Sequence, residues 1–155
     1  MNTAAVDQEH ITIPLPPEAH EWAQKFAAAQ DNPEKGKRIY LITLAVYAVN
    51  RYLRWLQVET DLEGSYSWNI ATNSSFDIAD LDLPKIGSLI CCPVLPDEES
   101  FTPPEMLPPN AIGYIAVQFK EVLNEVDLVG YRPILNPSEP KEELDLDILE
   151  AGDSD

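Results

Sequence analysis

Residues 39–49, IYLITLAVYAV, restrict the fold more than any other part of this sequence, because they are apolar on nearly every side of a helix. Just upstream, Asn32-Pro33 is typical of a helix N-terminus, with a capping side chain before a proline in the first turn. No glycine or proline interrupts residues 39–56. The pattern predicts one long helix from about 33 to 56 that is buried all round and forms the centre of the fold. A buried β-strand over 39–49 is the alternative.

One strand and one shorter helix are predicted before this central helix. Residues 9–15 alternate apolar and polar side chains, which is typical of a half-buried strand, and Pro14 places that strand at a sheet edge or ends it early. Pro16-Pro17 then suits a helix start, and apolar side chains recur three and four residues apart as far as Ala29.

After the central helix the apolar residues recur with a period of two, which is typical of strands. A polar loop over 57–75 is followed by predicted strands that end at Pro84 and cover 88–95, 112–119 and 125–131. Residues 96–110 contain five prolines and are expected to form an irregular connector. The fold class is therefore α+β: an N-terminal strand, two helices of which the second is long and buried, and an antiparallel β-meander.

The C-terminal segment differs from the rest of the chain. The 155 residues suit a single domain, which we expect to span residues 1–135. Residues 136–155 carry eight acids and one base, so they cannot build a core and are expected to be a disordered tail. Apolar side chains interrupt these acids, and such a mixture can dock into a groove with a basic rim; they are Leu144, Leu146, Ile148 and Leu149. A solvated tail with tolerated leucines is the alternative.

The formal charge of −17 limits the partners of this chain. Nucleic acids and anionic membrane surfaces are excluded because both are polyanions. No apolar run approaches the roughly 20 residues that span a bilayer. The adjacent Cys91 and Cys92 form no disulfide framework, and this favours a reducing, cytoplasmic location. All of the excess acid follows Arg54, so we expect a protein partner with a basic surface. The alternative is that the acidic surface only keeps the protein soluble.

The sequence contains no recognisable constellation of catalytic, metal-binding or cofactor-binding residues. His10 and His20 have no companion ligands at metal spacing and are expected at the surface. Cys91 and Cys92 lie in an apolar strand, which favours core packing over nucleophilic chemistry. The six glycines are isolated from one another, so no phosphate-binding loop is present. We therefore expect no enzymatic activity and no cofactor.

Residues 55–69, WLQVETDLEGSYSWN, form the one segment with a surface-recognition pattern. Aromatic side chains alternate there with hydrogen-bonding groups, as on protein-recognition loops; the candidate residues are Glu59, Asp61, Tyr66, Trp68 and Asn69. In the structural alternative, Tyr66 and Trp68 fold back over the helix end while Asp61 and Asn69 cap backbone groups. A divalent-cation site at Glu59, Asp61 and Glu63 has weaker support, because the spacing is not that of an EF-hand.

Several short motifs occur together in this chain, in the order Asn32-Pro33, Tyr40-Leu41, residues 44–50 (LAVYAVN), Tyr52-Leu53, Glu59-Thr60-Asp61, Ser67-Trp68-Asn69, residues 92–96 (CPVLP), Gly113-Tyr114 and Val117-Gln118-Phe119. With these motifs the sequence resembles the cyanobacterial domain-of-unknown-function family 1822, over about His10 to Tyr131. The resemblance implies no activity, cofactor or catalytic residue. Family members often continue with a longer variable region, and here the acidic tail stands in its place.

Three hypotheses about function follow from these patterns. The first is a non-enzymatic protein-interaction or regulatory module that binds a basic protein surface through the acidic tail, the 55–69 loop or both. The second is a small-molecule-binding or enzymatic domain with a pocket near Tyr66 and Trp68. The third is an assembly subunit that pairs through an edge strand.

Overall fold

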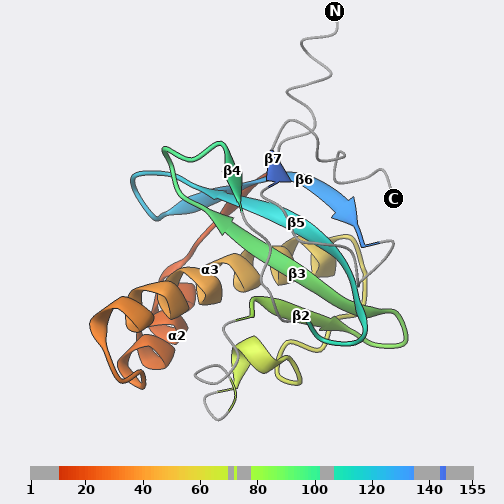
Figure 1. Ribbon diagram of the computed structural model, residues 1–155, viewed down its shortest axis with the longest axis horizontal. Helices are drawn as coiled ribbons and strands as arrows, with labels where there is room; N and C mark the ends of the chain where they lie inside the picture. The colour runs from red at the N-terminus through yellow and green to blue at the C-terminus, as the bar shows by residue number, and fades with distance from the viewer. Residues whose placement is uncertain (1–10, 70–71, 73–77, 102–106, 135–143, 146–155) are drawn as a thin grey trace, which may run out of the picture.

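The computed structural model describes residues 11–69, 72, 78–101, 107–134 and 144–145. A curled sheet wraps around one long helix, and a second helix packs beside it (Figure 1). The elements are, in chain order, β1 (Ile11–Pro14), α2 (Pro17–Ala28), α3 (Pro33–Trp55), the 3₁₀ helix η1 (Tyr66–Trp68), β2 (Asp80–Leu83), β3 (Gly87–Val94), β4 (Ser100–Phe101), β5 (Ala111–Phe119), β6 (Glu125–Pro133) and β7 (Leu144–Asp145). The predicted α+β class is confirmed.

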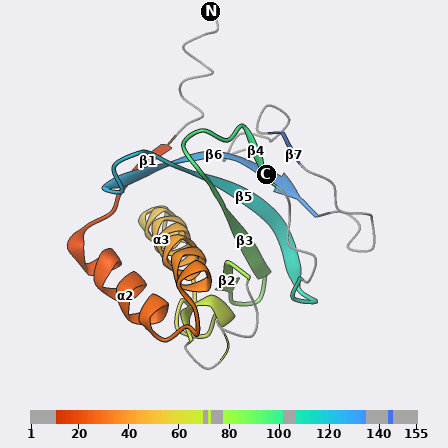
Figure 2. The same cartoon turned by 60° about the vertical axis from the view of Figure 1, so that its left-hand side comes forward.

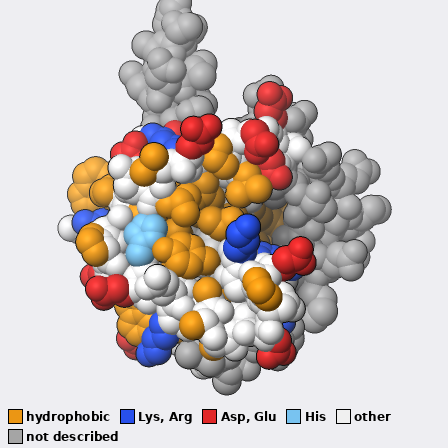
Figure 3. Space-filling model, turned by 90° about the vertical axis from the view of Figure 1, so that its left-hand side faces the viewer, with side chains coloured by type: hydrophobic (Ala, Val, Ile, Leu, Met, Phe, Trp, Pro, Cys, Tyr) orange, Lys and Arg blue, Asp and Glu red, His pale blue; other side chains and the backbone are white. Residues whose placement is uncertain are grey.

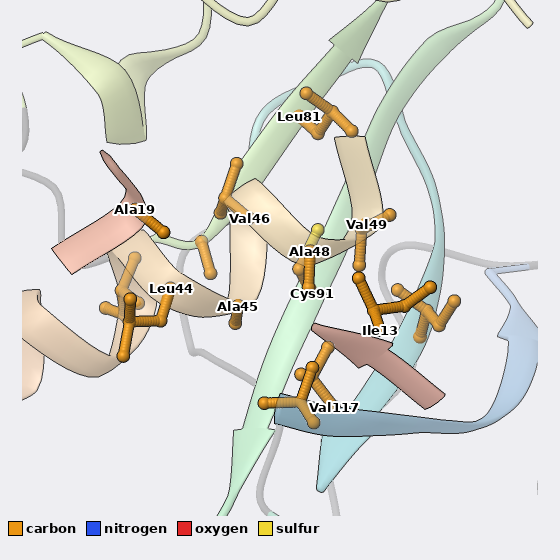
Figure 4. Packing of buried hydrophobic residues seen from close by; sticks show 14 of the residues in the cluster. Ile13, Ala19, Leu44, Ala45, Val46, Ala48, Val49, Leu81, Cys91 and Val117 are labelled. Carbon is orange, nitrogen blue, oxygen red and sulfur yellow. The ribbon is translucent and has the colours of Figure 1, made fainter. Parts of the chain in front are cut away.

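Helix α3 is the buried centre of the fold, as its apolar run predicted. It begins at Pro33, where the Asn32 side chain accepts a hydrogen bond from the Lys35 amide at 2.8 Å. Nine of its residues are buried, and the one hydroxyl among them, on Thr43, donates to the Ile39 carbonyl one turn earlier. Figure 4 shows apolar side chains of α3 gathered against Cys91 and Val117 of the sheet.

Helix α2 packs closely against α3. Its buried side chains, Ala19, Ala23 and Phe26, recur at intervals of three and four and so form one stripe. Gly36 of α3 lies against Ala27, where an added Cβ would stand 3.2 Å from the Ala27 carbonyl oxygen. Small residues at the contact therefore allow the two helices to approach closely. No helix among the described residues is both long enough and apolar enough to cross a membrane.

The sheet is mixed, and the prediction of an antiparallel meander is wrong in this respect. Its strand order is β1-β6-β5-β3-β2, and β3 pairs with β5 in parallel. All other neighbours in this sheet are antiparallel. A parallel pair needs a crossover of about a dozen residues or more, and residues 95–110 supply it between β3 and β5. The prediction that the first strand lies at an edge is confirmed, because β1 ends the strand order.

The two faces of the sheet are both apolar in their central part. Figure 2 shows α3 inside the curve of the sheet, and Leu89 and Cys91 of β3 belong to the core cluster that α3 builds there. The alternate residues of β3, Ile90, Cys92 and Val94, belong to a second buried cluster. Both cysteines are buried free thiols, so the prediction that they serve core packing is confirmed.

A second, two-stranded sheet joins distant parts of the chain. Strand β4 lies in the 96–110 connector, which was predicted to be irregular, and β7 lies in the segment predicted to be a disordered tail. The two pair in antiparallel register, with Ser100 opposite Asp145 and Phe101 opposite Leu144. The other residues of 136–155, like His10 at the opposite end, lie outside the described residues.

Candidate interaction site

The 55–69 loop begins where α3 ends in a left-handed turn. Gln57 has a φ of 68°, and beyond it the Val58 amide donates to the Leu53 carbonyl at 2.8 Å. The Thr60 hydroxyl then donates to the Asn50 side chain at 2.5 Å, so the chain folds back along the last turns of the helix. This reversal leaves the two residues at the helix end exposed: Trp55 at 75% and Leu56 at 52%.

The next part of the loop is fixed to the edge of β2 by hydrogen bonds. The Asp61 amide donates to the Asp82 carbonyl at 2.8 Å, which forms an isolated antiparallel bridge. The buried Ser65 hydroxyl donates to the Asp61 carbonyl at 2.9 Å and accepts from the Asp82 amide at 2.8 Å. Ser65 therefore ties both segments together through one side chain.

Asp80 of β2 holds the start of η1. Its side chain accepts from the Ser67 amide at 2.7 Å and from the Tyr66 amide at 3.0 Å, while its carbonyl accepts from the Ser67 hydroxyl at 2.6 Å. Asp80 is only 2% exposed. Burial raises the pKa of its carboxyl above the usual value, and the hydrogen bonds from Tyr66 and Ser67 oppose that rise. This carboxylate is thus a buried anchor for the loop.

We expect Asp80→Asn to lower the free energy of unfolding by about 1–3 kcal/mol, because the amide group cannot accept from both backbone N–H groups. The difference in the free energy of unfolding between the wild type and Asp80→Asn should grow as the pH falls from 7 to 4. Since the pKa of Asp80 is higher in the folded chain than in the unfolded chain, the folded state takes up that proton first, and acidification stabilises the wild type relative to the variant. Urea unfolding of both proteins at each pH measures the difference. A difference that is constant or shrinks on acidification would contradict this account of Asp80.

Trp68 anchors the end of the loop in an aromatic cluster. Its ring centroid lies 5.4 Å from Phe26 in an edge-on arrangement, 5.9 Å from Trp22 and 6.5 Å from Tyr47. Trp68 is only 7% exposed. It folds back onto the helices, as the structural alternative expected, and its ring contacts are with Trp22 and Phe26 of α2 and Tyr47 of α3.

The outer side of the loop carries the other candidate residues. Glu59, Asp61, Tyr66 and Asn69 are exposed, Tyr66 at 46%. The Asp61 carboxylate also accepts from the Gly64 amide at 3.0 Å, so it caps a turn as the alternative proposed.

Among the residues that the structure describes, no group of three or more His, Cys, Asp or Glu side chains could hold a metal ion. Loop and helix end together form what we call the loop surface: Trp55, Leu56, Glu59, Asp61, Tyr66 and Asn69.

The candidates in the C-terminal segment are placed only in part. The backbone of Leu144 belongs to β7, whereas Leu146, Ile148 and Leu149 lie outside the described residues.

The sequence patterns did not indicate that Asp80, Ser65 and Ser67 fix the loop. Asp80 and Asp82 resemble a chance pair of acids, and Ser65 and Ser67 resemble ordinary loop serines. The one available signal is that Asp80 directly precedes the apolar Leu81 at the start of a short strand, but this position does not distinguish a buried carboxylate from an exposed one.

His20 differs from its prediction, because it is half-buried and bridges two elements. Its Nε2 lies 2.7 Å from the Leu123 carbonyl, which can only accept, so Nε2 carries a proton. Its Nδ1 lies 2.6 Å from the Tyr40 hydroxyl, within hydrogen-bond distance. Figure 3 shows this face, on which a histidine borders a gathering of apolar side chains. His20 therefore joins α2 to α3 and to the β5–β6 turn.

A family model described as "Protein of unknown function (DUF1822)" matches residues 13–154. The chain belongs to this DUF1822 family. The match extends beyond the residues that carry the resemblance in the sequence and includes most of the acidic segment. No curated protein matches the chain, and no solved structure matches it.

Proposed function

We propose that this DUF1822 protein is a cytoplasmic, non-enzymatic interaction or regulatory module, of cyanobacterial origin, that docks a protein with a basic surface through its loop surface. One observation carries the proposal. The inner side of the loop is fixed by Asp80, Ser65 and Trp68, while its outer side presents exposed aromatic and acidic side chains.

A fixed loop is a favourable docking element because little conformational entropy remains to be lost on binding. Tryptophan and tyrosine are enriched among the residues that dominate binding energies, and Trp55 and Tyr66 are two such residues with large exposed fractions. The carboxylates of Glu59 and Asp61 lie on the same loop and would attract a basic partner. Aromatic contacts would supply affinity, and the carboxylates would select the partner.

The two other hypotheses have less support. A pocket near Tyr66 and Trp68 would need both side chains at its wall, but the Trp68 ring is packed against three other aromatic rings. Pairing through an edge strand would use β1 or β2, and the bridge from Asp61 already occupies part of the β2 edge.

Affinity capture from a native lysate tests the proposal, with the full chain as bait and bound proteins identified by mass spectrometry. The test variant is Glu59→Lys/Tyr66→Ala. The control is Glu121→Lys/Val122→Ala, which makes the same charge change and removes another exposed apolar side chain, at the β5–β6 turn. We expect a basic protein that the wild type and the control retain and the test variant loses. Equal retention by all three baits would refute docking through the loop surface.

A further inference from the structure

The outer face of the central sheet, opposite the helices, has an apolar centre. Its buried side chains come from β3, from β5 and from the chain just before β2, and they form the second core cluster: Ile78, Ile90, Cys92, Val94, Tyr114 and Ala116. Cys92 is 5% exposed and Tyr114 is 8% exposed. A sheet with helices on one side only is usually polar on the other side. An apolar centre that is buried therefore requires a cover.

Two parts of the chain lie on that side of the sheet. Leu107, from the connector, and Ile134, after β6, pack against the second cluster. Strand β4 of the same connector pairs with β7, and Figure 2 places both strands on the side of the sheet away from α3. The pairing fixes Leu144–Asp145, in the middle of the acidic segment, at this face. The family match, which runs to residue 154, includes this segment.

The charge of the face complements the segment. Arg132 of β6 stands opposite Tyr114 of β5, and directly opposed residues of antiparallel strands point to the same side of a sheet. Arg132 is exposed and shares this side of the sheet with Tyr114 of the apolar cluster. Residues 139–150 carry six of the chain's acids between leucines and an isoleucine. Arg132 therefore places one positive charge beside the apolar cluster, on the side of the sheet where the β4–β7 pairing holds part of the acidic segment.

We propose that the outer face of the sheet is a docking site for the chain's own C-terminal acidic segment, held by the β4–β7 pairing and by the charge of Arg132. The acidic segment is then not a free tail. Any partner that binds the leucines of the segment must compete with this intramolecular site, and its binding uncovers the face around Cys92. The proposal is independent of the loop surface, which lies at the end of α3 and beside β2.

The two adjacent cysteines report on the two faces separately, because Cys91 belongs to the helix-side cluster and Cys92 to the outer cluster. The full chain is prepared as Cys91→Ala and as Cys92→Ala, each with one remaining thiol, and its rate of reaction with a thiol reagent is measured. Leu144→Pro is then added to each, because proline removes a backbone donor and disrupts strand pairing. Arg132→Glu serves as a second, milder variant, and Arg51→Glu on exposed α3 surface serves as its control.

We expect Leu144→Pro to accelerate the reaction of Cys92 on the order of tenfold while the rate of Cys91 stays within about twofold, because release of the segment opens one face only. Arg132→Glu should accelerate Cys92 several-fold, and Arg51→Glu should not. Unchanged Cys92 rates in both variants would overturn the proposal. It would also be overturned if Cys91 and Cys92 were accelerated equally, since that result means global opening and not release from one face.

Discussion

Trp68→Ala is expected to lower the free energy of unfolding by about 3–5 kcal/mol, the usual cost of removing a buried large aromatic side chain. The indole packs against Trp22, Phe26 and Tyr47, so its loss leaves a cavity between the loop and both helices. Chemical denaturation followed by circular dichroism measures the change. The same substitution should loosen residues 65–69, which hydrogen exchange would detect as faster exchange of the Tyr66 and Ser67 amides.

Trp55→Ala is the matched control for this prediction. It removes the same side chain at a position that is 75% exposed, and it should change the free energy of unfolding by no more than about 0.5 kcal/mol. Equal effects of the two substitutions would mean that Trp68 is not an anchor. The outer side of the loop would then have no fixed support.

Leu44→Ala is expected to cost about 2–4 kcal/mol, because Leu44 is fully buried in the middle of α3 and its loss creates a cavity in the main core. The thermal midpoint should fall by several degrees, and the slope of the denaturant transition should stay the same. Val122→Ala, at an exposed position of the β5–β6 turn, is the control and should have little effect. An unchanged midpoint for Leu44→Ala would contradict the central position of α3.

The central helix could be predicted from sequence because its signals agree with one another. Asn32-Pro33 marks the N-terminus, and an apolar run without breaks follows. A buried strand remained an alternative because an apolar run has no clear period, and the length of the continuous segment favoured the helix. The end was correct within a residue even though Gln57, and no glycine, adopts the left-handed conformation there.

The order and direction of the strands could not be predicted in the same way. A period of two identifies β5 and β6, and an apolar segment identifies β3, but neither pattern contains information about which strands are neighbours. The parallel pairing of β3 and β5 depends on the path of residues 95–110, which return the chain to the starting end of β3. Proline content predicted an irregular connector and gave no indication of β4 or of its pairing with β7.

The structure separates roles within the 55–69 loop that its sequence pattern does not separate. Aromatic and acidic residues indicated the 55–69 loop, yet Tyr66 and Trp68, two positions apart, have opposite environments. The 3₁₀ turn η1 turns one ring outward and the other into the aromatic cluster. That turn depends on the Asp80 carboxylate, which is distant in sequence, so local pattern alone could not separate the anchor from the surface.

The most direct test of the account is the dissociation constant of the captured basic partner for the full chain and for Glu59→Lys/Tyr66→Ala. The account predicts binding weaker by at least roughly tenfold, about 1.4 kcal/mol, with an unchanged free energy of unfolding. Glu121→Lys/Val122→Ala should bind like the wild type. Equal dissociation constants for all three proteins would contradict the claim that a fixed loop presents the binding surface.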